Sequence, residues 1–64
     1  MVKINGNHTD YDGKTMTEIL DIMGYPPESV AVELNENILP KTKYSDTVMN
    51  DGDTVEIVRF VGGG

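Results

Sequence analysis

Apolar and polar positions alternate along the chain in two different periods. Val2 and Ile4 occupy alternate positions between polar neighbours, which is the period of a half-buried strand. The dipeptide Asn5-Gly6 follows, and it favours a tight type I′ turn because both positions tolerate positive φ. The pattern predicts a hairpin whose second strand runs from about residue 7 to residue 11.

The next segment has the period of a helix. Thr15 lies three residues before Glu18, which matches a capping box. Gly24 suits the left-handed position after a helix, and the two prolines at 26 and 27 forbid its continuation. The apolar residues between these caps fall on one helical face, and they are Met16, Ile19, Leu20 and Met23. We therefore expect one amphipathic helix.

The rest of the chain returns mostly to the strand period. Residues 30–35 alternate and predict a third strand, and a turn at 35–37 leads into a short apolar piece that Pro40 ends. The segment 41–49 has weak periodicity, so we expect only a short helical turn near Tyr44-Ser45-Asp46. Residues 50–53 give a strong turn signal.

The last strand is predicted from residue 54 to residue 61, and it has two apolar faces. Val55 and Ile57 are expected to enter the core, while Val58 and Phe60 point the other way. Together the elements predict a two-layer α+β fold, with a mixed four- to five-stranded sheet packed on one main helix. We expect a single domain over residues 1–61 and a flexible tail over residues 62–64.

Composition narrows the possible functions. The formal charge is −6, which disfavours binding to nucleic acid and favours binding to a basic surface on another protein. The plain alternative is that the charge only maintains solubility. Cysteine is absent, so thiolate metal sites are excluded, and His8 alone makes a poor metal site, so no metal is expected. No apolar run approaches membrane length, and the start does not resemble a secretory signal, so we expect a cytoplasmic protein.

The carboxyl end offers the strongest candidate chemistry. The chain ends Phe60-Val61-Gly62-Gly63-Gly64. Glycines lack Cβ, so such an end can pass through a narrow channel that side chains would block. A free α-carboxylate is ionised at neutral pH and is a poor electrophile, but conversion to an acyl-adenylate would give it a good leaving group. Sulfur could then attack the acyl carbon of the adenylate, and the product would be a thiocarboxylate. A frayed terminus without chemistry is the plain alternative.

The order of the motifs resembles the ThiS family of thiamin-biosynthesis sulfur carriers, within the ThiS/MoaD ubiquitin-like proteins. The resemblance spans essentially the whole chain. It is carried by Ile4-Asn5-Gly6, Met23-Gly24, the segment 30–35, Ile38-Leu39-Pro40, Asp51-Gly52-Asp53 and the glycine end. It implies a β-grasp fold with the first and last strands parallel in the centre of the sheet.

The resemblance also implies site residues and partners. A ThiF-type adenylating enzyme, which binds the ATP, would activate the carboxylate of Gly64, next to Gly63. A sulfur donor such as a cysteine desulfurase would then form the thiocarboxylate, and thiazole synthase, ThiG, would receive the sulfur. Gly62, Val61, Phe60 and Val58 would contact partners. No bound cofactor and no catalytic role of its own are expected for the chain.

Rival functions remain open at this stage. MoaD-like carriers supply sulfur for molybdopterin, and related carriers serve tRNA thiolation or cysteine synthesis. A passive ubiquitin-like interaction module, whose tail has no chemistry, is a rival of another class. An enzyme is disfavoured, because no nucleophile–base pair or metal cluster can be assembled from these residues.

Overall fold

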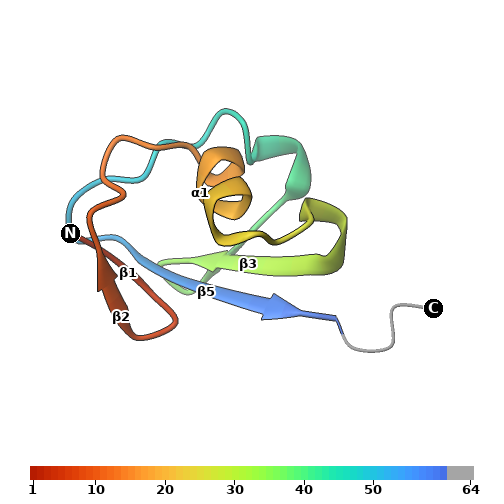
Figure 1. Ribbon diagram of the computed structural model, residues 1–64, viewed down its shortest axis with the longest axis horizontal. Coiled ribbons are helices and arrows are strands. Elements are labelled where there is room, and N and C mark those ends of the chain that lie inside the picture. Colours follow the sequence, from red (N-terminus) through yellow and green to blue (C-terminus); the bar gives the residue numbers. More distant parts are fainter. Residues whose placement is uncertain (61–64) are drawn as a thin grey trace.

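The computed structural model describes residues 1–60 of the chain. Within them the chain forms one α-helix, two short 3-10 helices and five strands (Figure 1). In order, the elements are β1 (Val2–Ile4), β2 (Asn7–Thr9), α1 (Met16–Met23), η1 (Pro27–Ser29), β3 (Val30–Leu34), β4 (Asn37–Leu39), η2 (Lys41–Lys43) and β5 (Thr54–Arg59). The predicted tail over 62–64, and the boundary before it, lie outside the described residues.

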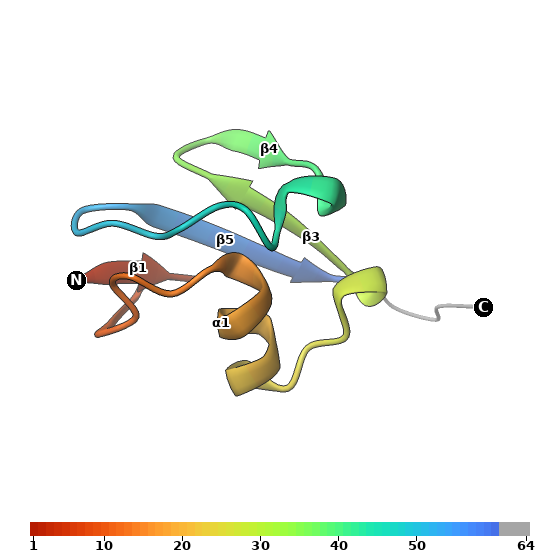
Figure 2. The ribbon, with the colours of Figure 1, turned by 90° about the horizontal axis from the view of Figure 1, so that it is seen from above.

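The strands form one mixed sheet in the order β2-β1-β5-β3-β4. The first and last strands, β1 and β5, are parallel, with Lys3 in register with Thr54, and every other pairing is antiparallel. Viewed from above, α1 crosses one face of this sheet (Figure 2). The predicted two-layer α+β architecture is confirmed, and β5, which leads to the carboxyl end, is the central strand.

Two asparagines at hairpin turns connect the turns to β5. Asn5 and Asn35 both have φ of 50°, the left-handed conformation that asparagine tolerates. The Asn5 side chain accepts a hydrogen bond from the Ile57 amide at 2.7 Å and donates one to the Ile57 carbonyl at 3.2 Å. Asn35 accepts one from the Thr54 amide at 2.9 Å. The side chains therefore continue the pairing with β5 where the backbone of β1 and β3 turns away.

The predicted helix caps are both present. The Thr15 amide donates to the Glu18 carboxylate at 2.8 Å, and the Glu18 amide donates to the Thr15 hydroxyl at 3.2 Å. The hydrogen bond from the Thr15 backbone amide favours the ionised carboxylate and is the main reason that the pKa of Glu18 lies below its usual value. Gly24 ends α1 with φ of 80°. Because glycine lacks a Cβ, it takes this left-handed conformation without steric cost.

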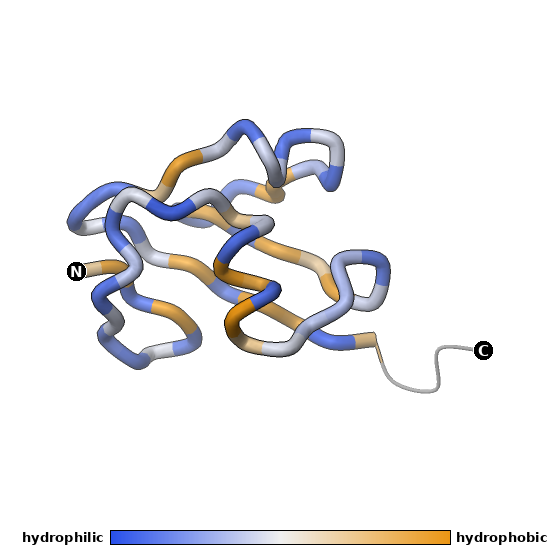
Figure 3. The backbone as a smooth tube through the Cα atoms, turned by 45° about the horizontal axis from the view of Figure 1, so that its top comes forward, coloured by the Kyte–Doolittle hydropathy of each residue, from blue (hydrophilic) through white to orange (hydrophobic). Residues whose placement is uncertain are grey.

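The core lies between α1 and the sheet. Along the strands and the helix, hydrophobic segments alternate with hydrophilic ones (Figure 3). The buried side chains are Val2, Ile4, Met16, Ile19, Leu20, Val30, Val32, Tyr44, Met49, Val55 and Ile57. The predicted inward positions of the strands and of α1 are confirmed, except that Met23 and Leu34 are only partly buried.

The crossover between β4 and β5 differs from its prediction. The helical turn expected near Tyr44-Ser45-Asp46 lies earlier, at Lys41–Lys43, because Pro40 fixes the backbone at its start and its carbonyl accepts from the Lys43 amide at 2.9 Å. Tyr44 comes directly after this turn, and its side chain is buried in the core. The crossover is then bound to the start of α1 by hydrogen bonds from Met16 to Thr47 and from Met49 to Lys14.

Two strands also end earlier than predicted. The second strand stops at Thr9 rather than near residue 11, and Tyr11 instead packs against the core as part of the loop. The last strand stops at Arg59, although the Phe60 amide still donates to the Ser29 carbonyl at 2.9 Å. The part of that prediction that covers Val61 lies outside the described residues.

Candidate functional site

The predicted site is divided by the limit of the described residues. Gly64, Gly63, Gly62 and Val61 lie beyond residue 60, so the structure describes only the base from which they extend. That base is the end of β5, at the opposite end of the molecule from the N-terminus (Figure 1). The start of β5 is paired with both β1 and β3, whereas its end, at Val58 and Arg59, is paired with β3 alone. The attachment point of the carboxyl end is therefore held by β3 and by the bond from the Phe60 amide to the Ser29 carbonyl.

Val58 and Phe60, the two predicted contact residues within the structure, are both exposed. Their exposed fractions are 57% and 53%, which are high for large apolar side chains. Val58 lies opposite Ala31 of β3 on the sheet face away from α1. The side-chain alternation predicted for this strand is therefore confirmed, whereas a partner contact stays a prediction.

The same open face carries carboxylates that sequence reasoning did not single out. Glu56 lies directly opposite Glu33, which in turn lies opposite the exposed Ile38 of β4. A shallow depression on this face is lined by Glu33, Glu36, Thr54, Glu56 and Val58. Like charges opposite one another weaken a strand pair. Only the strand register brings these side chains together, so no local sequence signal identifies them.

Two cations lie over aromatic rings near the end of β5. The Arg59 guanidinium carbon is 5.7 Å from the centre of the Tyr25 ring, and the Lys41 Nζ is 5.8 Å from the centre of the Phe60 ring. Lys41 also donates to the Glu28 carbonyl at 3.3 Å. These four side chains come from three separate segments, and the sequence alone gave no sign of the pairs.

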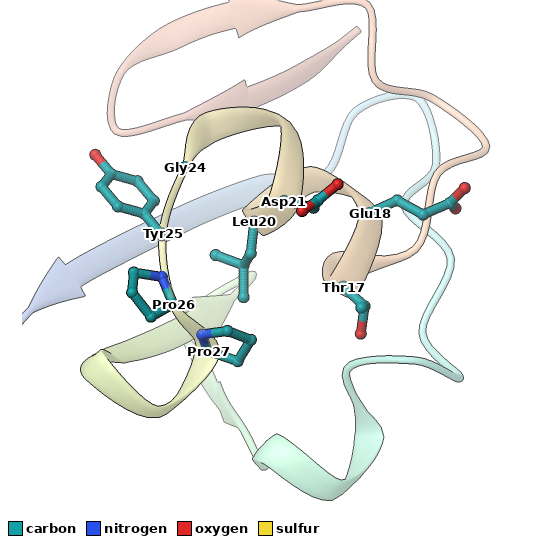
Figure 4. A pocket seen from close by; sticks show the side chains of 8 residues that line it. All are labelled: Thr17, Glu18, Leu20, Asp21, Gly24, Tyr25, Pro26 and Pro27. Atoms are coloured by element: carbon teal, nitrogen blue, oxygen red, sulfur yellow. The ribbon is translucent and has the colours of Figure 1, made fainter.

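A groove lies between α1 and the loop that follows it (Figure 4). It is lined by Thr17, Glu18, Leu20, Asp21, Gly24, Tyr25, Pro26 and Pro27. The lowered pKa of Glu18 keeps this carboxylate ionised at neutral pH, which does not suit a general acid.

Over residues 1–60, no three side chains of the metal-ligating types lie close enough to hold an ion. His8, set aside as a metal ligand, is exposed on β2. In the same part of the chain, no helix has the length and apolar character needed to cross a bilayer.

Comparison with known proteins identifies the family. Residues 2–64, which include the glycine end, match the ThiS family. The chain belongs to the ThiS family. It is 41% identical to the sulfur carrier protein ThiS of Thermus thermophilus, over 100% of both chains. It is also 42% identical to a thiazole synthase of Paramagnetospirillum magneticum, where the match covers 95% of this chain and 19% of that protein.

The fold agrees with that of a solved ThiS. The crystal structure of the thiamine biosynthesis protein ThiS from Geobacter metallireducens superposes with a TM-score of 0.79 at 34% identity, covering 98% of this chain and 97% of that one. The predicted β-grasp fold is therefore confirmed. Because ThiS proteins are sulfur carriers of thiamin biosynthesis, membership of the ThiS family also confirms the predicted class of function, a carrier rather than a catalyst.

Proposed function

We propose that this ThiS family member carries sulfur on the carboxylate of Gly64, as a thiocarboxylate destined for the thiazole ring of thiamin. The observation that carries the proposal is that the family match runs through residue 64, to the end of the glycine run. The absence of cysteine supports it, because no thiol of the chain can hold the sulfur instead.

The chemistry divides between this chain and its partners. A carboxylate oxygen of Gly64 attacks the α-phosphorus of ATP and pyrophosphate leaves, which gives an acyl-adenylate. The terminal persulfide sulfur of a donor such as a cysteine desulfurase then attacks the acyl carbon, and AMP leaves, which gives an acyl disulfide. A thiol reductant cleaves this disulfide and is itself oxidised, which releases the thiocarboxylate on Gly64. The chain contributes the electrophile and a folded body that the enzymes recognise, and ATP is bound by the adenylating enzyme.

Three partners follow from this scheme. A ThiF-type enzyme would adenylate Gly64, a donor would supply the sulfur, and thiazole synthase would receive it. The match of this chain to part of a protein named thiazole synthase supports the last of these. Val58 and Phe60, exposed directly before the glycine end, would contact these enzymes together with Val61 and Gly62.

Intact-mass spectrometry tests the proposal. After incubation with ATP, the cognate adenylating enzyme and a sulfur donor, the chain should gain the mass difference between sulfur and oxygen, located at Gly64. A variant with one alanine added after Gly64 is the matched control and should gain nothing, because its terminal residue brings a Cβ into the narrow channel.

Two results would contradict the proposal. One is a folded wild-type chain that stays unmodified with its cognate enzymes. The other is a thiazole-requiring strain that grows on the alanine-capped or Gly64-deleted chain. The second result would instead favour a passive interaction module, whose partner affinity does not need the terminal carboxylate.

A further inference from the structure

The end of β5 presents two positive charges beside aromatic rings on an acidic molecule. Arg59 lies over Tyr25, and Lys41 lies over Phe60, with both cations within 6 Å of a ring centre. Both side chains remain exposed. A cation over an aromatic face is attracted by the ring and still presents its charge to solvent. The pairs therefore position the two charges without neutralising them.

One loop holds both pairs. Tyr25 and Glu28 belong to the segment between α1 and β3, and the Glu28 carbonyl accepts from Lys41 at 3.3 Å. The neighbouring Ser29 carbonyl accepts from the Phe60 amide at 2.9 Å, so η1 lies beside the end of β5 (Figure 2). These bonds place Lys41 and Arg59 on the surface that surrounds the start of the carboxyl-terminal segment.

Neither cation is paired with a carboxylate in the part of the chain that the structure describes. The chain has eleven acidic residues. Yet the ion pairs within 4.0 Å among residues 1–60 join only the Met1 amine to Asp12 and Asp51. Lys41 uses the backbone carbonyl of Glu28 and not its carboxylate. The two charges are therefore available to an external anionic group.

The covalent reach of the tail brings a partner to this surface. Gly64 follows Phe60 by four residues. Even fully extended, four residues span at most about 14 Å. An enzyme that takes the Gly64 carboxylate into its active site must therefore place its own surface close to Phe60. This step rests on the function proposed above.

We propose that Lys41 and Arg59 dock on an acidic protein surface that surrounds the opening through which the adenylating enzyme receives the tail. A basic surface there would leave both cations facing like charge, whereas carboxylates would pair with them. Since the chain as a whole carries a charge of −6, a positive end would also orient it during approach, with the tail toward the enzyme.

Two charge-reversed variants of equal net charge test this inference. Lys41→Glu/Arg59→Glu changes the docking pair. Lys3→Glu/Lys14→Glu changes cations elsewhere, since Lys3 lies in register with Thr54 at the opposite end of β5 and Lys14 precedes α1. Each replacement lowers the charge by two, so both double variants carry −10 in place of −6. Association with the cognate adenylating enzyme is measured at low and high salt.

At low salt, the docking variant should associate about tenfold more slowly than the control variant, and the difference should shrink at high salt. Its rate of adenylation at saturating concentration should match that of the wild type, because no reacting atom has changed. If circular dichroism shows that the reversed variant is unfolded, Lys41→Gln/Arg59→Gln replaces it, with a smaller loss of the same sign.

The outcomes separate the two proposals. Equal association rates for the docking and control variants, with a wild-type chain that is adenylated normally, would overturn the docking surface alone. A wild-type chain that the cognate enzyme never adenylates would overturn the proposed function and this inference with it.

Discussion

Asn5 shows how much one side chain does in this small protein. Its backbone takes the left-handed conformation that the hairpin needs, and its amide group binds both the N–H and the C=O of Ile57. The sequence predicts the first role, because Asn-Gly is a strong hairpin signal. The second role joins residues 52 positions apart, and no local pattern reports it.

Replacing Asn5 separates these two roles. Asn5→Gly keeps the turn, because glycine accepts positive φ, but it leaves both Ile57 backbone groups without the side-chain partner. We expect a loss of about 1–2 kcal/mol in the free energy of unfolding, measured by urea denaturation. Asn5→Asp keeps the acceptor for the Ile57 amide and should lose less. Equal stability of the glycine variant and the wild type would refute a role for the side chain.

At the scale of the element, β5 has one buried face and one exposed face. Val55 and Ile57 are buried against α1, while Val58 and the adjacent Phe60 are exposed at the base of the carboxyl end. The period of two predicts this division correctly. The strand's central place in the sheet came only from the resemblance, since periodicity does not report pairing partners.

The exposed apolar side chains should serve partners more than stability. Val58→Ser/Phe60→Ser should weaken binding to the adenylating enzyme or to thiazole synthase at least about tenfold, if they lie at the centre of the contact. The change should scarcely affect the urea midpoint. Ile22→Ser is the matched control, because Ile22 is 52% exposed on α1. Equal affinities for these variants would remove Val58 and Phe60 from the interface.

The opposed carboxylates of β3 and β5 lead to a second prediction at the scale of the element. Glu56→Thr removes a charge that faces Glu33 and introduces a residue that favours strands, so it should stabilise the fold by up to about 1 kcal/mol. The double variant with Glu33→Thr measures the coupling between the two positions. If the single effects simply add, the two carboxylates do not interact.

At the scale of the whole molecule, the small size of the core limits the stability of the fold. Among residues 1–60, eleven side chains are buried in one cluster between the one α-helix and the sheet. A domain of this length buries only about 60% of the surface of its unfolded chain, so its stability is modest. Under the function proposed above, the body has to stay folded while enzymes bind its surface and use its carboxyl end.

Shortening one buried side chain should therefore abolish function by unfolding the domain. Ile19 is fully buried on α1, and Ile19→Ala should cost roughly 3 kcal/mol, a large share of the total stability of so small a domain. Ile22→Ala, on the exposed side of the same helix, should change the stability by less than about 0.5 kcal/mol. Thermal unfolding followed by circular dichroism distinguishes them. Similar midpoints would show that the core tolerates the cavity.

The sequence by itself determined the local features of this protein, because they depend on neighbouring residues. Turn residues with positive φ, the Thr15–Glu18 capping box, Gly24 and the alternation of buried positions were all readable from short stretches. The glycine end is the sequence feature on which the proposed chemistry depends. Tertiary structure alone decided which distant groups meet. It placed Glu33 opposite Glu56, Tyr44 in the core and Lys41 over Phe60, because strand register and chain crossings depend on how the whole core packs rather than on any one segment.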